Sequence, residues 1–252
     1  MSSYNHILAK SIENGGITLE SHLGSFAVLA ARHAGMDIEI ARQGALLHDI
    51  GKASIVFQRR LKNRPSPLEL PFRHEIASLF FLKLSHPELW PFMVSMIIAH
   101  HKSIYKDIST TGIIDLDIEY KEDILQFHLT GFSSWVADAI GILTNLNFPC
   151  VTHETVITED DAREAYFFAL DYCKKSPKGW SPWKGLLIGA DHIASAVGDF
   201  KENVPILFAI PNVDYYNRKG DLYPLSLIDS DKSKKHTFVK APTGAGKTDF
   251  LI

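Results

Sequence analysis

Side chains that bind transition metals occur in five separated segments of the chain. Imidazole and carboxylate groups together suit first-row transition metals, and a bound divalent ion turns water into a nucleophile near neutral pH. The pattern therefore predicts metal-assisted hydrolysis. The candidate metal ligands are His22, His48, Asp49, His74, His100, His101 and Asp191.

The most specific of these segments is LLHDIGK, in which two leucines precede His48 and Asp49 and Gly51 follows them. Neighbouring residues on a helix lie about 100° apart, so both side chains can flank one interior point near a helix end. A buried ionisable group is costly unless it is paired or metal-bound. Lys52, close to one turn beyond Asp49, is predicted to reach the same pocket and hold a phosphate oxygen. Asp49 and Lys52 are the candidate catalytic residues.

Each of the remaining candidate ligands also fits a structural role. His100 and His101 end an apolar helical segment that directs at least one imidazole inward. His74 opens a helix, where it could be solvated, and His22 stands at a helix start. Asp191 lies in LLIGADHIASA, where a carboxylate among apolar neighbours needs a partner. The joint occurrence of all these residues supports a metal site.

Other histidines are expected in ordinary roles. His33 lies near the helix face of His22 and is expected in the core or on the surface, with a supporting place behind the ligands as the alternative. Polar or loop-like contexts predict solvated side chains for His6, His86, His128, His153 and His236.

A second signal lies near the C-terminal end, where residues 241–248 read APTGAGKT. In this phosphate-binding pattern backbone amides cradle phosphates, Lys247 reaches the β/γ oxygens and Thr248 ligates Mg²⁺. The preceding HTFVK is strand-like, which is the context that the loop requires. The candidate nucleotide-binding residues are Gly244, Gly246, Lys247 and Thr248. No acidic partner segment follows within these 252 residues, so we expect no ATP hydrolysis by this sequence alone.

Composition indicates an ordinary globular protein. The residues are 46% apolar and 22% charged, as is common in globular proteins. A length of 252 residues suffices for one large domain or one domain plus a fragment. No apolar run approaches the roughly 18 residues of a membrane span, and no signal-peptide pattern is present. The two cysteines, Cys150 and Cys173, are expected as free thiols in a reducing cytoplasm. A net charge of −3 confines any DNA contact to local patches.

Hydrophobic periodicity predicts helices over the first two hundred residues. One of them continues through DIEIARQGALLHDIGK until Gly51 closes it, and another starts at Thr158 with Asp161 in its first turn. Helices around the site are expected between His101 and Asp191, with an irregular loop near DIEYKED. PILFAI and HTFVK read as strands, so a domain boundary is placed around residues 200–215.

Two basic stretches are candidates for contact with a nucleic-acid backbone. QRRLKNR, residues 58–64, lies between two segments with candidate ligands, and its alternative is a solvated loop. The second combines four lysines with two tryptophans on which bases could stack, although WSPW could equally pack against the core. It comprises Lys174, Lys175, Lys178, Lys184, Trp180 and Trp183.

The order of these motifs resembles the CRISPR-associated HD nuclease–helicases of type I interference systems. The resemblance spans nearly the whole chain and rests on His22, HDIGK at 48–52, FQRRL at 57–61, His74, His100, His101, Asp191 and APTGAGKT at 241–248. It implies a mostly α, HD-type helical phosphohydrolase domain in residues 1–205. Residues 206–252 would be a linker and a short stub of an α/β RecA-like helicase domain.

The resemblance also implies the ligands of two metal ions. The first would be held by His22, His48, Asp49 and Asp191. Asp49 would bridge to a second ion held by His74, His100 and His101. One or two Mn²⁺, Ni²⁺, Co²⁺ or Fe²⁺ ions are expected, with Mg²⁺ as an alternative, and ATP with Mg²⁺ for the full-length helicase only.

The function implied by the resemblance is metal-dependent cleavage of single-stranded DNA in CRISPR interference. The full-length protein would work in the cytoplasm with an RNA-guided surveillance complex and without a membrane. The same ligands would serve a nucleotide or cyclic-dinucleotide phosphohydrolase, but a motor loop has no use there. A recruitment module with a vestigial site is a third hypothesis, against which the complete set of ligands argues.

Overall fold

The computed structural model describes residues 4–33, 37–62, 68–99, 104–106, 111–120, 122–175 and 181–197. These residues belong to the first of the two units into which the chain divides, Met1–Pro205. The described part is mostly helical, and its one extended pairing is an isolated antiparallel bridge between Leu8 and Thr18. The mostly α prediction is therefore confirmed for this part. The predicted strands, phosphate-binding loop and domain boundary lie outside the described residues and stay predictions.

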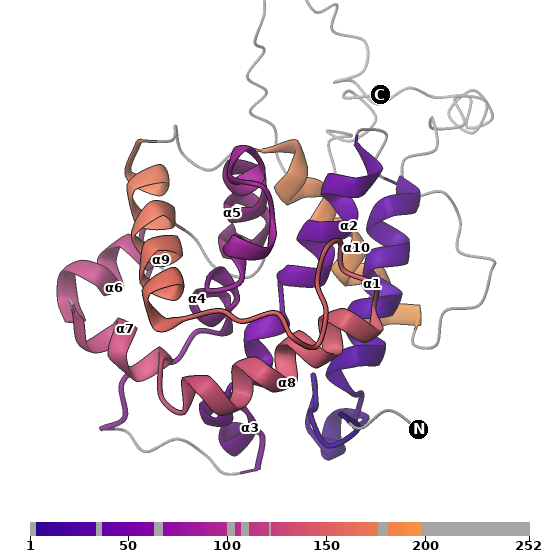
Figure 1. Ribbon diagram of the computed structural model, residues 1–252, viewed down its shortest axis with the longest axis horizontal. Coiled ribbons are helices and arrows are strands. Elements are labelled where there is room, and N and C mark those ends of the chain that lie inside the picture. The colour runs from indigo at the N-terminus through magenta and orange to yellow at the C-terminus, as the bar shows by residue number, and fades with distance from the viewer. Residues whose placement is uncertain are drawn as a thin grey trace, which may run out of the picture. The chain divides into compact units, whose positions relative to one another are not determined.

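The helices of the described part are labelled in chain order in Figure 1. They are α1 (Leu19–His33), α2 (Ile38–Leu47), α3 (Ile55–Lys62), α4 (His74–Leu79), α5 (Trp90–Ala99), α6 (Ile113–Tyr120), α7 (Glu122–His128), α8 (Phe132–Asn145), α9 (Glu159–Lys175) and α10 (Pro182–Val197). Single 3-10 turns are η1 (Ile12–Asn14), η2 (Ile50–Ala53), η3 (Leu82–Leu84) and η4 (Pro87–Leu89).

Side-chain caps define where several helices begin. The Asp37 carboxylate accepts hydrogen bonds from the backbone amides of Glu39 and Ile40 at the start of α2. At α9 the Thr158 hydroxyl oxygen accepts from the Asp161 amide at 3.1 Å, while the Asp161 carboxylate accepts from the Thr158 amide at 3.0 Å. Such reciprocal pairs satisfy amides that the helix itself leaves unpaired. The predicted start of this helix at Thr158 is confirmed.

Two predicted boundaries are wrong. α2 ends at Leu47, and Gly51 lies in the separate turn η2 instead of closing the helix. This turn packs against α4. The expected loop at DIEYKED is mostly helix, because residues 117–120 end α6 and residues 122–123 begin α7.

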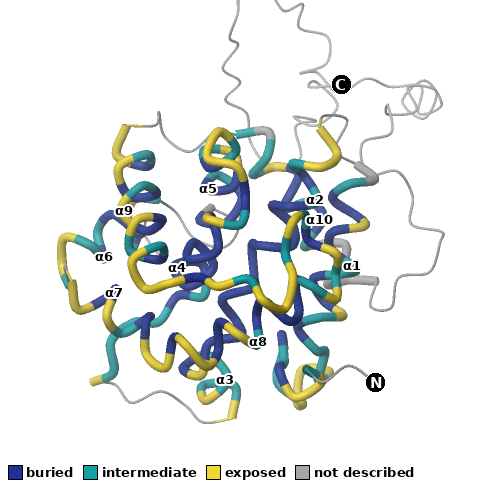
Figure 2. The backbone as a smooth tube through the Cα atoms, viewed as in Figure 1, coloured by how far each residue is buried: buried dark blue, intermediate teal, exposed yellow. Residues whose placement is uncertain are grey.

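The helices α1 and α10, which carry His22 and Asp191, pack against α2. α1, α2 and α10 contact one another and lie side by side, and α5 contacts α2 and α10 (Figure 1). The short helix α4 contacts η2, α5 and α9. It is among the most buried helices and is dark blue over most of its length in Figure 2. No helix within the described ranges is long and apolar enough to cross a bilayer.

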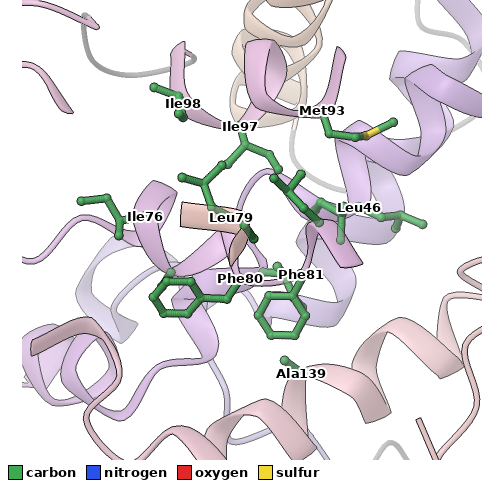
Figure 3. Packing of buried hydrophobic residues seen from close by; sticks show 14 of the residues in the cluster. Leu46, Ile76, Leu79, Phe80, Phe81, Met93, Ile97, Ile98 and Ala139 are labelled. Carbon is green, nitrogen blue, oxygen red and sulfur yellow. The ribbon is translucent and has the colours of Figure 1, made fainter. Parts of the chain in front are cut away.

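An aromatic and aliphatic core lies behind α4. Phe80 and Phe81, which follow α4, point toward α8 near Ala139 (Figure 3). The Phe80 ring lies edge-on to Phe132 with centroids 5.9 Å apart, and Phe81 and Trp135 are 5.8 Å apart. Full burial of one such side chain contributes about 1.5–3 kcal/mol. This packing holds α4, and with it His74, in a defined place.

Gly51 is required by the close approach of η2 and α4. A Cβ at this position would stand 2.2 Å from the His74 carbonyl oxygen and 2.5 Å from the Ser78 backbone nitrogen. The Gly51 amide also donates to the Ser78 hydroxyl at 2.9 Å. Because the obstructing atoms are backbone, a side chain here can be accommodated only if α4 moves.

We expect Gly51→Ala to lower the free energy of unfolding by about 1–3 kcal/mol or more, as overpacking in a core does. The matched control is Gly185→Ala on α10, where an added Cβ meets nothing within 4 Å. That change should raise stability by about 0.5–1 kcal/mol, because alanine favours helix. Urea unfolding of both variants measures the difference, and equal stability of the two would contradict the close approach.

Candidate metal centre

Asp49 lies at the centre of the candidate site, between the end of α2 and the start of η2. Its side chain is 1% exposed. The Oδ2 atom is 3.0 Å from His22 Nε2 and 2.6 Å from Lys52 Nζ, and Oδ1 is 2.9 Å from His74 Nε2. The two carboxylate oxygens therefore face different partners. This arrangement compensates a buried negative charge from several sides.

His22 comes from the first turn of α1, as predicted. The Thr18 hydroxyl accepts from the Ser21 amide at 3.2 Å and the Thr18 carbonyl accepts from the His22 amide at 3.0 Å, which places this turn. The His22 imidazole is 7% exposed and lies 5.8 Å, centroid to centroid, from the His48 ring. The start of α1 thus places His22 next to the Asp49 carboxylate.

His48 is completely buried and follows the last residue of α2. Its Nδ1 is 2.6 Å from the Ala45 carbonyl oxygen, so Nδ1 carries the hydrogen and donates it. Its Nε2 lies 3.3 Å from Asp49 Oδ2. The ring of Phe26 stacks on the imidazole at 4.2 Å and an interplanar angle of 28°. Metal-bound histidines commonly show this arrangement, in which a backbone carbonyl fixes the tautomer and orients the other nitrogen.

The donor set fits a divalent transition metal. One ligand atom each from His22, His48 and Asp49 lies within 4.8 Å of the other two, and all three residues are buried. Two imidazoles and one carboxylate are a ligand set of catalytic zinc and non-haem iron sites. These three residues could hold one ion, with positions left for water and substrate.

His74 extends the site on the other side of Asp49. It is the first residue of α4 and its side chain is 15% exposed. Because His74 contacts Oδ1 while His22 contacts Oδ2, the carboxylate separates two imidazole environments. The predicted bridging role of Asp49 between two ions matches this geometry and stays a prediction.

Lys52 reaches the site from η2, as predicted. Its Nζ donates to Asp49 Oδ2, and the side chain is 11% exposed. The ammonium lies 5.9 Å from the centroid of the Phe57 ring, and that ring lies edge-on to His74 at 5.8 Å. The Phe57 ring therefore lies beside both the Lys52 ammonium and the His74 imidazole.

Three residues behind His74 were not among the candidate site residues of the sequence analysis. The Glu75 carboxylate is 3.7 Å from His74 Nδ1, and the Arg73 guanidinium is 3.3 Å from the other Glu75 oxygen. The Arg73 amide donates to His128 Nε2 at 2.8 Å. His128 is fully buried, which corrects the expectation of a solvated side chain. The contact is made with a residue 55 positions away, which the local sequence does not record.

His128 is held in its neutral form. Its Nδ1 hydrogen goes to the Ile124 carbonyl at 2.6 Å and Nε2 accepts from Arg73, so both nitrogens are used without a second proton. The ring stacks on Phe72 at 4.5 Å. Burial lowers the pKa of His128 from 6.5 to about 4. The remaining solvated histidines that the structure describes, His6, His86 and His153, are exposed as predicted.

Other candidates fall partly or wholly outside the described residues. His100, His101 and the phosphate-binding residues Gly244, Gly246, Lys247 and Thr248 lie there, and their roles stay predictions. The side chain of His33 is likewise not described. Asp191 lies on α10, which packs against α1, and is half-buried, not inside the core. It does not belong to the described group of ligand atoms within 4.8 Å.

The basic stretch after η2 has a structural role in its described part. Arg59 and Arg60 both pair with Glu69, and Arg60 donates to the Leu70 carbonyl at 2.8 Å. The Arg60 guanidinium also lies over the Phe72 ring at 5.8 Å. Of the second basic stretch, Trp183 is half-buried and packs against the core, and its ring centroid lies 5.8 Å from that of the exposed Phe92.

Comparison with known proteins finds one informative similarity. A stretch of 48 residues is 48% identical to part of the CRISPR-associated nuclease/helicase Cas3, subtype I-F/YPEST, of Pseudomonas aeruginosa (strain UCBPP-PA14). This stretch is similar to Cas3. It covers 19% of this chain and 4% of that protein. No family model and no solved structure matches the chain.

Stability should depend on pH through His128. Its folded pKa is below the unfolded value, so its contribution is complete above pH 6.5 and is lost as the pH falls toward 4. The loss amounts to about 3 kcal/mol, at 1.36 kcal/mol per pKa unit. Urea unfolding between pH 7.5 and 4 should show a smaller pH slope for His128→Gln. The control His86→Gln, at an exposed site, should keep the wild-type slope. Identical slopes for all three proteins would refute the assignment.

Proposed function

We propose that this chain supplies the nuclease domain of a CRISPR-associated nuclease–helicase and cleaves single-stranded DNA with divalent metal ions. The observation that carries the proposal is the convergence of His22, His48, His74 and Lys52 on the buried carboxylate of Asp49. The similarity of a 48-residue stretch to a protein named as a nuclease/helicase supports a nucleic-acid substrate. Burial of so many ionisable groups at one point is costly for stability and is typical of functional sites.

The proposed metal ligands divide between two sides of Asp49. His22, His48 and Asp49 would hold one ion, with Asp191 on α10 as a further ligand. His74, His100 and His101 would hold a second ion that shares the Asp49 carboxylate. When bound, a divalent metal supplies hydroxide near neutral pH and neutralises charge on the phosphate.

Lys52 has two functions in this proposal. Its ammonium contacts Asp49 Oδ2 at 2.6 Å, which orients the carboxylate. An ammonium has three N–H donors, so after one of them contacts Asp49 the others can bind a non-bridging phosphate oxygen. The Phe57 ring beside it restricts its movement. Lys52 would therefore stabilise the extra negative charge that develops on the non-bridging phosphate oxygens during hydrolysis.

The proposed division of the chain follows from the same assignment. All described groups of the site come from residues within 1–205, which would form the nuclease domain. Residues 206–252 would begin a helicase domain in which Gly244, Gly246, Lys247 and Thr248 bind ATP. The surveillance complex would be the partner of the whole nuclease–helicase.

The first test is the reaction itself. The purified chain should degrade single-stranded DNA with Mn²⁺, Ni²⁺, Co²⁺ or Fe²⁺ and leave intact duplex uncut, because a duplex holds its backbone away from a buried centre. Gel analysis of both substrates, with and without excess chelator, measures this. Cleavage undiminished by chelator would exclude the metal mechanism. Hydrolysis of nucleotides or cyclic dinucleotides in place of DNA would favour the small-molecule phosphohydrolase.

Asp49→Asn should reduce cleavage of single-stranded DNA by about a hundredfold or more, since even the loss of an outer partner of a metal site costs roughly 10–100-fold. The amide keeps the shape of the carboxylate and removes its charge. Asp117→Asn is the matched control, because Asp117 also accepts from a lysine, at 3.5 Å, away from the site. Near-native cleavage by Asp49→Asn, measured beside the control, would end the proposed role of this carboxylate.

A further inference from the structure

Gln58 on α3 uses its amide group to join two backbone segments. Its Nε2 donates to the Lys52 carbonyl at 2.7 Å and to the Leu8 carbonyl at 2.8 Å. Its Oε1 accepts from the Leu8 amide at 3.1 Å. Both amide hydrogens and the oxygen of Gln58 are therefore used. Its side chain binds both the backbone N–H and the backbone carbonyl of Leu8. A primary amide is the neutral side-chain group that offers two donors and an acceptor together.

One of these segments leads directly to His22. Leu8 forms the antiparallel bridge with Thr18, and the Leu19 amide donates to the Ile7 carbonyl at 2.8 Å. Thr18 in turn accepts from the amides of the first turn of α1, including that of His22 at 3.0 Å. Gln58 is thus linked to the turn that carries His22 through the Leu8–Thr18 bridge, whose hydrogen bonds run from the Ala9 amide to the Ile17 carbonyl and from the Leu19 amide to the Ile7 carbonyl.

The other segment carries Asp49 and Lys52. The Lys52 amide donates to the Asp49 carbonyl at 2.9 Å in η2, and the Lys52 side chain returns to Asp49 Oδ2. Gln58 binds the Lys52 carbonyl at the end of this turn. α3 also places Phe57, the neighbour of Gln58, against the Lys52 ammonium. The start of α3 therefore restrains both the backbone and the side chain of Lys52.

We propose that Gln58 is a positioning residue for the metal centre, which sets the separation between His22 and the Asp49–Lys52 turn. The inference rests on the proposed metal-dependent function. Metal–ligand distances tolerate deviations of only about 0.2 Å, so a small drift of the start of α1 relative to η2 weakens binding without unfolding the protein. Outer residues that orient metal ligands typically contribute about 10–100-fold to metal affinity.

The test compares Gln58→Leu with wild type in the full chain, using Co²⁺ alone as the probe. Leucine keeps most of the volume and removes all three hydrogen bonds. We expect Co²⁺ to bind about tenfold more weakly by calorimetry, with altered visible absorption bands, while the protein stays folded by circular dichroism. Gln58→Glu carries the same test if the leucine variant does not fold, because its carboxylate cannot donate to the two carbonyls.

Gln43→Leu is the matched control. Gln43 is a 7% exposed glutamine on α2 that accepts from the Ser85 hydroxyl at 3.0 Å and donates to Glu39, away from the site. Its removal should cost stability in urea but leave Co²⁺ affinity unchanged. Affinity of Gln58→Leu within twofold of wild type, or an equal loss in Gln43→Leu, overturns the positioning role alone. Absence of Co²⁺ binding by wild type overturns the proposed function and this inference together.

Discussion

A carboxylate removed from water must have its charge compensated, and Asp49, 1% exposed, imposes this requirement where α1, η2 and α4 meet. Each of these elements supplies one nitrogen to it: His22, Lys52 and His74. The contact of Lys52 is made within the turn that follows Asp49, whereas those of His22 and His74 form only when α1 and α4 have packed against η2. The charge and the packing therefore depend on each other, and loss of one partner would leave the others around an incompletely compensated carboxylate.

Close packing makes the contacts at Asp49 possible. η2 approaches the backbone of α4 so closely that Gly51 has no room for a side chain. Phe26 covers one face of His48, and the aromatic core around Phe80 supports α4 from behind. Because protein interiors have crystal-like density, they resist small displacements. A site that requires ligand atoms to be placed within fractions of an ångström benefits from this rigidity.

Polar groups behind the site extend the same principle. The neutral His128 accepts from the Arg73 amide at the start of α4, and the Arg73 guanidinium reaches Glu75 beside His74. Gln58 joins η2 to the segment that leads into α1. These residues hold the elements from which the candidate ligands project.

The sequence by itself indicated a mostly helical protein, the start of α9 at Thr158 and a group of metal-binding residue types. These features are local: periodicity and capping depend on neighbours within a few residues, and side-chain chemistry depends on none. His22, His48 and Asp49 were foreseen on that basis, and the structure brings them together.

Tertiary structure alone decided which residues support the candidate ligands His22, His48 and Asp49. The end of α2 at Leu47, the burial of His128 and the hydrogen bonds of Gln58 depend on partners up to 55 residues away in the chain. Nothing in the local sequence around a glutamine or histidine records which distant backbone group will meet its side chain. The types of the residues thus indicate which of them are candidate ligands, whereas the placement of these ligands follows from contacts that exist only once the helices have packed.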